Sequence, residues 1–384
     1  MPARRFPLVD AMRALAALAV VGTHTAYFAG AYAPGTFLGP YAQRLDVGVT
    51  LFFVISGFLL YRPWVLARHE GRRSPDTGLY AWRRVLRIVP AYWVALTAAL
   101  VLVTAAGGWS WDRTPALFGF AQAYRADTLG YGLVQGWSLC VELAFYVFLP
   151  VWGAGMRRVR GGLGAEWLGL ALLAAVAIAW KVVVTATTGS PQRVEIGPWL
   201  FALPTFLDQF AVGMGLAVAT VHLGNRPTPA WLDRGAGASW LLAGVAFWVT
   251  STQIGISELF GAWTPLQYLG RHLLYLVIAA LLLWPAVLGH GGPLRRALAL
   301  RPLEWIGVVS YGIFLWNTTV LDQLAQASFE PFLGIHPYVA WPLAVVPITL
   351  ALAAASWYGI ERPLQRLGRR RPRRRLSPAR AAAG

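Results

Sequence analysis

The sequence predicts an all-α integral membrane protein, built as a bundle of about ten transmembrane helices. Three observations support this fold class. The 384-residue chain is 57% hydrophobic and only 13% charged, and its apolar residues come in long blocks. Those blocks have about the 17–25 residues that a helix needs to cross a bilayer. Their near-uniform apolarity excludes a membrane barrel, whose strands would alternate apolar and polar residues.

Ten apolar blocks fit a transmembrane helix, and the fourth is the weakest because it is short and carries Glu142. The first block is expected to remain as a span, since it is long and lacks a small-residue cleavage pattern. Together they place a transmembrane domain over residues 1–367. The predicted spans are 8–28, 46–66, 86–106, 137–156, 167–187, 199–221, 239–259, 269–289, 303–323 and 339–360.

The arginines support this number of spans, because every second loop is rich in them. Basic loops stay on the cytoplasmic side of a membrane, so both termini are predicted to be cytoplasmic, in a multi-pass protein of the cell membrane. The formal charge of +17 therefore reflects topology and gives no basic face for nucleic acid. The arginine-rich stretches are 4–5, 68–87, 157–160, 226–234, 295–301 and 369–375.

The last stretch, residues 368–384, is rich in Arg, Pro and Ala, which predicts a disordered basic tail on the cytoplasmic side. The single cysteine, Cys140, excludes an internal disulfide and a cysteine-based zinc cluster, so no metal site is expected. No other stretch is long and polar enough for a second, soluble domain.

The first span carries ionisable residues that a lipid-facing helix would avoid. Arg13 and His24 are eleven positions apart, close to three helical turns, so they share one face about 16 Å apart. Asp10 precedes Arg13 by three residues on roughly that face. In a purely structural interpretation, Asp10 and Arg13 lie at the membrane–water interface, and His24 is a core residue whose hydrogen bonds are made within the protein. A function is favoured, because imidazole is well suited to moving a proton near neutral pH.

Two further acids lie inside predicted spans. Glu142 is expected to find a partner on another helix, such as Arg13, His24 or a loop arginine, because an unpaired buried carboxylate is costly. The alternative is a structural ion pair that only holds the bundle together. Asp208 could pair with Lys181, the only lysine of the chain, or hold a substrate hydroxyl.

Arginines and aromatic residues cluster before the third span, in "YAWRRVLRIVPAYW". Arg84 and Arg87 share a helix face, and with Arg83 they would make a better phosphate clamp than topology requires. Tyr92 belongs to a group of aromatic rings on which an adenine could stack. The simpler interpretation is the positive-inside rule, which accounts for any two arginines at this end of a span.

Ser56 and Trp137 are further candidate substrate-binding residues, placed with these arginines and Tyr92 in one predicted site. Ser56 precedes Gly57 inside the second span, where glycine allows two helices to approach closely. No Gly-x-Ser-x-Gly elbow surrounds Ser56, so it is not expected to be a nucleophile. Trp137 opens the fourth span in "WSLCVELAFY".

Six segments of the chain, taken in their order, resemble the membrane acyltransferase-3 family. Its members are polytopic O-acyltransferases that acylate bacterial polysaccharides, glycolipids and macrolides. The resemblance covers nearly the whole chain. It implies transfer of an acyl group, by default acetyl, from cytoplasmic acyl-CoA to a hydroxyl of a sugar, glycolipid or macrolide-type acceptor, with no permanently bound cofactor. It rests on "LVDAMRALAALAVVGTH", "GVTLFFVISGFLL", "RRVLRIVPAYW", "WSLCVELAFY", "LEWIGVVSYGIFLW" and "ERPL".

The same resemblance implies roles for single residues. His24 and Arg13 would form the catalytic pair, with Asp10 near them. Arg84 and Arg87 match the family's Arg-x-x-Arg motif, which engages the donor. Glu142 matches the acid of the fourth span.

The chain also departs from the family pattern. Ala11 and Ala14 stand where the family usually has glycine, which is a mild change. Asn317 follows "FLW" where many members have histidine, which points to a different acceptor and makes Asn317, with Asp208, a candidate acceptor-side residue. Some long members carry a fused hydrolase-like domain that is not expected here, so the helical bundle should handle the acceptor itself.

The expected mechanism has His24 as the general base that takes a proton from the acceptor hydroxyl. A covalent acyl-histidine is an equally open route. The rival class is a proton-coupled transporter of a small molecule or a lipid-linked glycan, which also uses buried ionisable residues. The paired broken helices typical of such carriers are not seen in the sequence. A non-catalytic scaffold would leave the buried polar residues unexplained, and acyl-CoA binding separates the transferase from both rivals.

Overall fold

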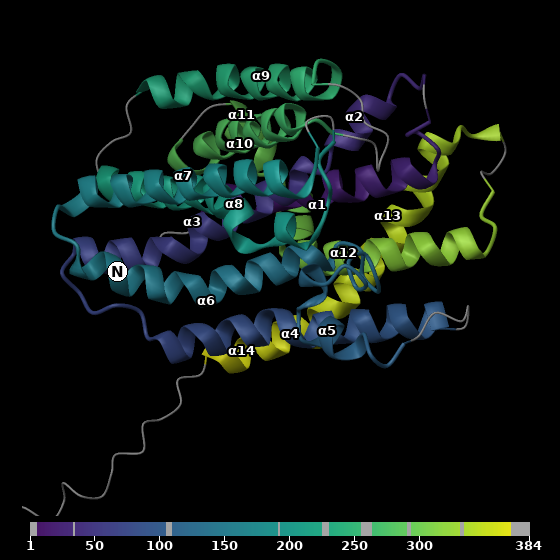
Figure 1. Cartoon of the computed structure of the whole chain (residues 1–384), viewed down its shortest axis with the longest axis horizontal. Helices are drawn as coiled ribbons and strands as arrows, with labels where there is room; N and C mark the ends of the chain where they lie inside the picture. The colour runs from purple at the N-terminus through teal and green to yellow at the C-terminus, as the bar shows by residue number, and fades with distance from the viewer. Residues whose placement is uncertain are drawn as a thin grey trace, which may run out of the picture.

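The computed structural model describes residues 6–33, 35–104, 110–190, 193–224, 230–254, 263–289, 293–330 and 334–369. Over these residues the chain folds into helices, and the long ones lie side by side in one bundle (Figure 1). The helices with at least 20 residues are α1 (Pro7–Phe28), α3 (Val47–His69), α4 (Thr77–Thr104), α6 (Gly136–Arg158), α7 (Gly162–Thr188), α8 (Leu203–Leu223), α9 (Ala230–Thr252), α10 (Pro265–Leu288), α12 (Arg301–Gln326) and α13 (Pro337–Ser356). Short helices connect or extend them: α2 (Gly39–Arg44), α5 (Thr114–Phe118), α11 (Pro293–Leu298) and α14 (Arg362–Arg369).

Each predicted span overlaps one of these long helices. Eight helices in the described residues are long and apolar enough to cross a membrane, so the chain is a multi-pass membrane protein. The two long helices outside that group are α9 and α12. The polarity of α12 has a clear origin, because it buries Ser310, Asn317, Thr318 and Thr319 inside the bundle. The number of ten membrane crossings therefore stays a prediction.

The predicted boundaries differ most from the structure at α4 and α9. Helix α4 begins at Thr77, nine residues before the predicted span, because the Asp76 carboxylate accepts a hydrogen bond from the Leu79 backbone N–H at 2.8 Å. Arg83 and Arg84, which belong to the predicted loop, consequently lie inside α4. Helix α9 ends at Thr252, before the predicted end at 259, and residues 255–262 lie outside the described part. The predicted tail also lies outside it, from residue 370 onward.

Two glycines let α3 and α8 touch through their backbones. A Cβ atom added to Gly213 of α8 would collide with the backbone of α3 at Val54 and Phe58. A Cβ added to Gly57 of α3 would collide with the backbone at Phe210 in the same way. The close approach predicted at Gly57 is therefore confirmed. This contact fixes α3 near the middle of the bundle, where α1 and α6 also pack against it.

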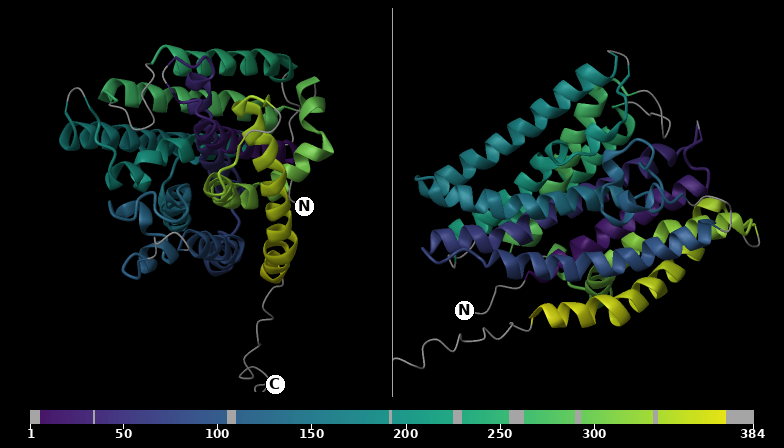
Figure 2. Two further views of the ribbon diagram at one scale, coloured as in Figure 1. Left: turned by 90° about the vertical axis from the view of Figure 1, so that its right-hand side faces the viewer. Right: turned by 60° about the horizontal axis from the view of Figure 1, so that its bottom comes forward.

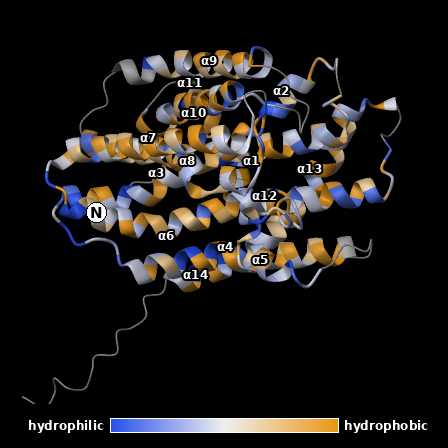
Figure 3. Ribbon diagram, in the orientation of Figure 1, coloured by the Kyte–Doolittle hydropathy of each residue, from blue (hydrophilic) through white to orange (hydrophobic). Residues whose placement is uncertain are grey.

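Figure 3 shows a group of hydrophilic segments at the end of the bundle that carries the N label. Helix α1 begins and α14 ends at the same end, and the hydrophilic loops 70–76 and 159–161 lie there too (Figures 1 and 2). We call this the arginine end, because its loops and helix ends carry Arg68, Arg72, Arg73, Arg157, Arg158 and Arg160. Helices α3, α6, α8 and α10 begin at the opposite end, which we call the far end.

Candidate active site

A cavity of about 240 Å³ lies inside the bundle, between α1, α3, α4, α6 and α12. Five of the predicted site residues line it: Arg13, Ser56, Arg84, Arg87 and Glu142. They come from four different helices, so only the folded bundle brings them together. We call this space the arginine cavity, because its lining holds three arginines and a single acid.

Glu142 is held in the arginine cavity by two hydroxyl groups. Its Oε1 accepts hydrogen bonds from Ser56 Oγ at 2.8 Å and from Tyr146 Oη at 2.6 Å. Glu142 thus does have a partner on another helix, but this partner is Ser56 of α3. Within the described residues Glu142 makes no ion pair, which differs from the predicted pairing with a base. The three arginines surround it at longer range, where the low polarity of the interior keeps their attraction effective.

The neighbouring arginines Arg83 and Arg84 point to different places. The Arg84 guanidinium lies 5.9 Å and 5.8 Å from the ring centres of Tyr80 and Tyr146. Its Nε is buried and has no hydrogen-bond partner within the described part of the chain. Arg83 instead donates from Nε to the Gly368 carbonyl at 3.1 Å, outside the cavity. The predicted three-arginine clamp is thus corrected, because successive helical residues point about 100° apart.

Arg13 reaches the arginine cavity from the first turns of α1. Its Nη1 lies 3.5 Å from Asp10 Oδ1, one helical turn earlier. The Arg13 side chain is 14% exposed and that of Asp10 is 36% exposed, so the pair lies at the edge of the cavity with the cation further inside. Asp10 itself does not line the cavity.

His24 is paired with Asn317, the residue that departs from the family pattern. His24 Nδ1 lies 2.6 Å from Asn317 Oδ1 on α12. The Asn317 Nδ2 donates to the carbonyls of Ile313 at 3.0 Å and Phe314 at 2.8 Å, and this fixes which end of the amide faces the histidine. An acceptor oxygen there requires a proton on Nδ1, so in neutral His24 the lone pair is on Nε2. His24 can therefore accept a proton only at Nε2.

The residues around His24 keep its helix end ordered. Tyr32, in the turn after α1, donates to the Thr23 carbonyl at 3.0 Å and pairs with the Thr23 hydroxyl. Burial raises the pKa of Tyr32 to about 12, so it stays a neutral hydroxyl.

Tyr92 and Trp137 lie outside the arginine cavity, contrary to their predicted place in a donor site. Tyr92 is fully buried, donates to the Leu117 carbonyl at 2.9 Å and stacks on Phe120 with ring centres 4.3 Å apart. It therefore anchors the segment that follows α4 and has no free face for an adenine. Trp137 lines a second space at the far end.

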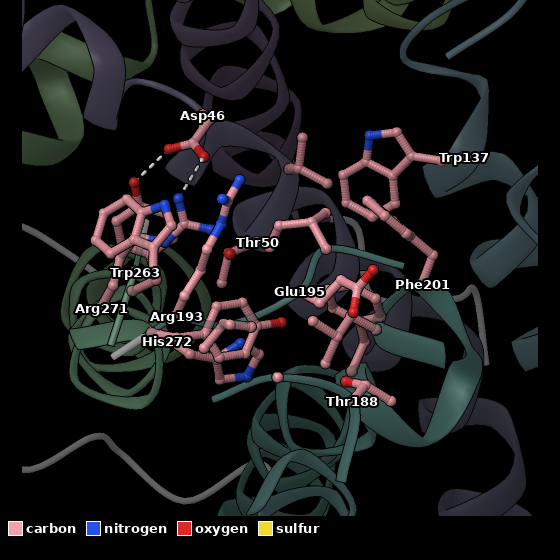
Figure 4. A pocket seen from close by; sticks show the side chains of 18 of the residues that line it. Asp46, Thr50, Trp137, Thr188, Arg193, Glu195, Phe201, Trp263, Arg271 and His272 are labelled. Atoms are coloured by element: carbon pink, nitrogen blue, oxygen red, sulfur yellow. Dashed lines mark hydrogen bonds and ion pairs between the residues drawn. The ribbon is translucent and has the colours of Figure 1, made fainter. Parts of the chain in front are cut away.

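That second space is a cavity of about 890 Å³, which we call the large cavity. Figure 4 shows Trp137 beside Phe201 on one side of it and Asp46 on another. The Asp46 carboxylate accepts a hydrogen bond from the Tyr275 hydroxyl and lies 3.6 Å from Arg271 Nη1. The lining side chains come from the far-end termini of α3, α6, α7, α8 and α10 and from the loop that follows α7.

Asp208 belongs to a buried cluster behind the large cavity. The predicted pairing with Lys181 is confirmed, with Nζ 2.6 Å from Asp208 Oδ2. His272 joins them, with Nε2 2.9 Å from Lys181 Nζ and 3.0 Å from Asp208 Oδ2. His272 also lines the large cavity, whereas Asp208 does not.

Asp46, Arg271 and His272 are ionisable residues of the large cavity for which the sequence predicted no site role. His272 lies inside the eighth predicted span, where the rule that singled out His24 applies equally. The sequence also contains a motif that predicts where α10 begins, because Thr264 and Gln267 form a reciprocal capping box. That cap fixes the helix phase that turns Arg271 and His272 toward the cavity.

A family model described as an acyltransferase domain matches residues 6–360 of the chain. The match covers α1 to the end of α13 and so includes every residue of both cavities. No solved structure is significantly similar to the chain.

Several characterised bacterial proteins are similar along most of the chain. The peptidoglycan O-acetyltransferase OatA of Listeria monocytogenes is 27% identical over 94% of the chain. The acyltransferase MdmB of Streptomyces mycarofaciens is 27% identical over 97% of the chain and 95% of its own length. The exopolysaccharide production protein ExoZ of Rhizobium meliloti is 30% identical over 84% of the chain and 90% of its own length. The chain spans only 56% of OatA and 57% of YrhL from Bacillus subtilis.

Proposed function

Because the chain belongs to the acyltransferase family whose model spans residues 6–360, we propose that it is a membrane O-acyltransferase. It moves an acyl group, by default acetyl, from acyl-CoA to a hydroxyl of a sugar, glycolipid or macrolide-type acceptor. OatA is named as a peptidoglycan O-acetyltransferase and MdmB as an acyltransferase, which supports this reaction class. The bundle would lie in the cell membrane with its arginine end toward the cytoplasm, where acyl-CoA is made.

The arginine cavity is the observation that carries the proposal. Arg13, Arg84 and Arg87 line it with Glu142 as the single acid, and Asp10 pairs with Arg13 from outside the lining, so the arginines exceed these acids by one positive charge (three minus two). Such an excess inside a membrane protein is costly unless an anion balances it. The phosphates of CoA are suitable anions, since guanidinium groups bind phosphate oxygens through paired hydrogen bonds. The buried, unpartnered Nε of Arg84 is one donor ready for such a contact.

In the proposed reaction His24 acts through Nε2. As the acceptor oxygen attacks the thioester carbonyl carbon, Nε2 takes the hydroxyl proton. The tetrahedral intermediate then collapses, the C–S bond breaks, and the imidazolium returns the proton to the CoA sulfur. Asn317 is a positioning residue here, because its Oδ1 holds the Nδ1 proton and keeps Nε2 free. The products are an ester and free CoA thiol, and the thioester is itself an activated donor that needs no metal.

Helix α1 sets the distance that the donor must cover. Arg13 lies at the arginine cavity and His24 eleven residues later, about 16 Å further along the axis. Phe314, which lines the cavity, accepts a hydrogen bond from Asn317 through its carbonyl. The cavity thus ends one helical turn from the His24–Asn317 pair. With its phosphates at Arg84 and Arg87, CoA would extend its acyl arm toward His24, and positioning would supply much of the rate.

The test is acceptor-dependent thiol release by the purified chain. Acetyl-CoA is incubated with panels of sugar, glycolipid and macrolide acceptors, and free CoA is measured. We expect His24→Ala to lower the rate about 10²–10⁴-fold, the usual contribution of a general base. His69→Ala, an exposed histidine at the end of α3, is the matched control and should retain the rate.

Normal acylation by folded His24→Ala protein would refute the general-base role. Acetyl-CoA that binds but leaves a labelled acetyl group on His24, in the absence of acceptor, would replace direct transfer with an acyl-histidine route. Absence of acetyl-CoA binding would refute the transferase function as a whole.

A further inference from the structure

The large cavity has a defined lining of polar and aromatic side chains, and the proposed binding of acyl-CoA in the arginine cavity leaves it free for another ligand. Its lining comes from five helix termini and one loop at the far end, whereas the arginine cavity lies between α1, α3, α4, α6 and α12 in the interior of the bundle. The two spaces share one lining residue, Val49 of α3. Asp46, one turn before Val49, lines the large cavity, and the preceding residue Leu45 lies against Gly22 of α1, two residues before His24. The large cavity therefore lies beside the proposed base.

One wall of the large cavity is aromatic. Trp137 lies with its ring centre 5.0 Å from that of Phe201 and 5.5 Å from that of Phe206 (Figure 4). Phe53 packs behind them, 5.3 Å from Phe206, and holds the group in place. Trp137 and Phe201 are both partly exposed. A rigid, partly open aromatic surface suits the C–H face of a ring-shaped ligand.

The other walls carry charged groups whose charges cancel. Arg193 and Arg271 supply two positive charges, and Asp46 and Glu195 supply two negative charges. His272 is backed by the Lys181–Asp208 ion pair, which is also balanced. A charged ligand would have to leave one of these signs uncompensated in a space of low polarity, which is unfavourable. Guanidinium and carboxylate groups do bind hydroxyls well, because they donate and accept strong hydrogen bonds.

We propose that the large cavity binds the acceptor, and that it selects an uncharged glycosyl unit. One face of the sugar ring lies on the Trp137 wall, and its hydroxyls meet Asp46, Arg271 and Arg193. This inference rests on the proposed function, since it names the acceptor of the same reaction. It also assigns Trp137 to the acceptor, in contrast to the donor-site role predicted from sequence.

The test uses a single cysteine as a reporter of occupancy. In a Cys140→Ala background, Thr188→Cys places a thiol on the cavity lining. Thr187→Cys, the preceding residue, is exposed, lies outside the lining and serves as the matched control. Maleimide labelling is timed with the methyl glycosides of glucose, galactose and N-acetylglucosamine, and with methyl glucuronide and methyl glucosaminide as charged analogues. Acetyl-CoA binding is measured on the same preparations.

We expect at least one uncharged glycoside to slow labelling at position 188 but not at 187. At about ten times its Kd the sugar should slow labelling about ten-fold, because about one site in ten stays free. The charged analogues should not protect. Trp137→Ala should remove the protection, whereas Trp248→Ala, an exposed residue of α9, should leave it unchanged.

Absence of protection by every uncharged glycoside would overturn the site. Equal protection by methyl glucuronide or methyl glucosaminide would overturn the selection for an uncharged ligand. Either result with intact acetyl-CoA binding would leave the proposed transferase standing. Protection without acetyl-CoA binding would instead overturn the transferase and keep the glycoside site.

Discussion

At the scale of single residues, the contact between His24 and Asn317 decides which nitrogen can act as a base. Asn317 is fully buried and its amide donates to two carbonyls of its own helix, so it cannot rotate without losing both hydrogen bonds. Its Oδ1 therefore stays directed at His24 Nδ1, 2.6 Å away. A histidine at position 317 could orient His24 through a ring nitrogen, and an asparagine does so through an oxygen.

Asn317→Leu should lower kcat while leaving KM for acetyl-CoA unchanged. A lost acceptor for a buried N–H costs about 1–3 kcal/mol, which corresponds to about 5-fold to 150-fold in rate. Asn317→Asp should restore most of the rate, because a carboxylate also accepts from Nδ1. Thr319→Val is the control, since the Thr319 hydroxyl is buried on the same helix with no hydrogen-bond partner in the described chain. A full rate for Asn317→Leu would contradict the positioning role.

Arg83 and Arg84 are neighbours with the same charge, but only Arg84 lines the arginine cavity, so their alanine variants test whether the cavity or the overall charge binds the donor. Arg84→Ala removes a cavity guanidinium and should raise KM for acetyl-CoA about ten-fold or more, the worth of a charged hydrogen bond. Arg83→Ala removes the same charge from outside the cavity and should change KM less than about two-fold, as for a surface ion. Steady-state kinetics with acetyl-CoA as the varied substrate measure both. Equal effects of the two variants would show that general positive charge, and not the cavity, attracts the donor.

Several site residues could be predicted from the sequence because a charge inside an apolar block is visible without a structure. Arg13 and Glu142 were predicted in this way and Arg84 from the arginine cluster before the third predicted span, and the bundle brings all three to one cavity. Asn317 as the partner of His24 could not be found, since 293 positions separate them. Tyr92 was misplaced because an aromatic residue beside arginines looks the same whether its ring is open or packed against Phe120.

At the scale of helices, the contact between α3 and α8 depends on glycine. Gly213→Val should destabilise the folded bundle by about 1–3 kcal/mol, the usual cost of forcing atoms into a packed interior. The reason is that its Cβ would meet the α3 backbone at Val54 and Phe58. Gly244→Ala on α9 is the control, because its Cβ would meet open space. Thermal unfolding in detergent, followed by size-exclusion chromatography, compares them; equal midpoints would contradict the role of the close contact.

The existence of the helices follows from apolar block length, but their boundaries depend on polar caps. Helix α4 begins early because Asp76 caps it, a signal that was readable in "SPDTG". Helix α12 is polar because it faces the bundle interior, so block apolarity alone describes it poorly. The packing of one helix on another could not be predicted, because it depends on which faces meet.

At the scale of the whole molecule, the two cavities and α1 define one path through the bundle. The arginine cavity lies inside the bundle and is lined by arginines of α1 and α4, the large cavity is at the far end, and Val49 lines both. Helix α1 runs beside them with Arg13 near one end and His24 near the other. The order of helices and the alternation of basic loops could be predicted from the sequence. The cavities could not, because each is bounded by five helices that are distant in the chain.

This arrangement requires a fixed orientation in the membrane, which can be measured. Thr77 at the start of α4 and Ala126 in the segment before α6 are both exposed and lie at opposite ends of the bundle. In a Cys140→Ala background, Ala126→Cys should react with a membrane-impermeant maleimide on whole cells, because arginine-poor loops face outward. Thr77→Cys should react only after lysis, since its loop belongs to the arginine end. The reverse pattern would place the arginine cavity away from cytoplasmic acyl-CoA, and the proposed path would then fail as a whole.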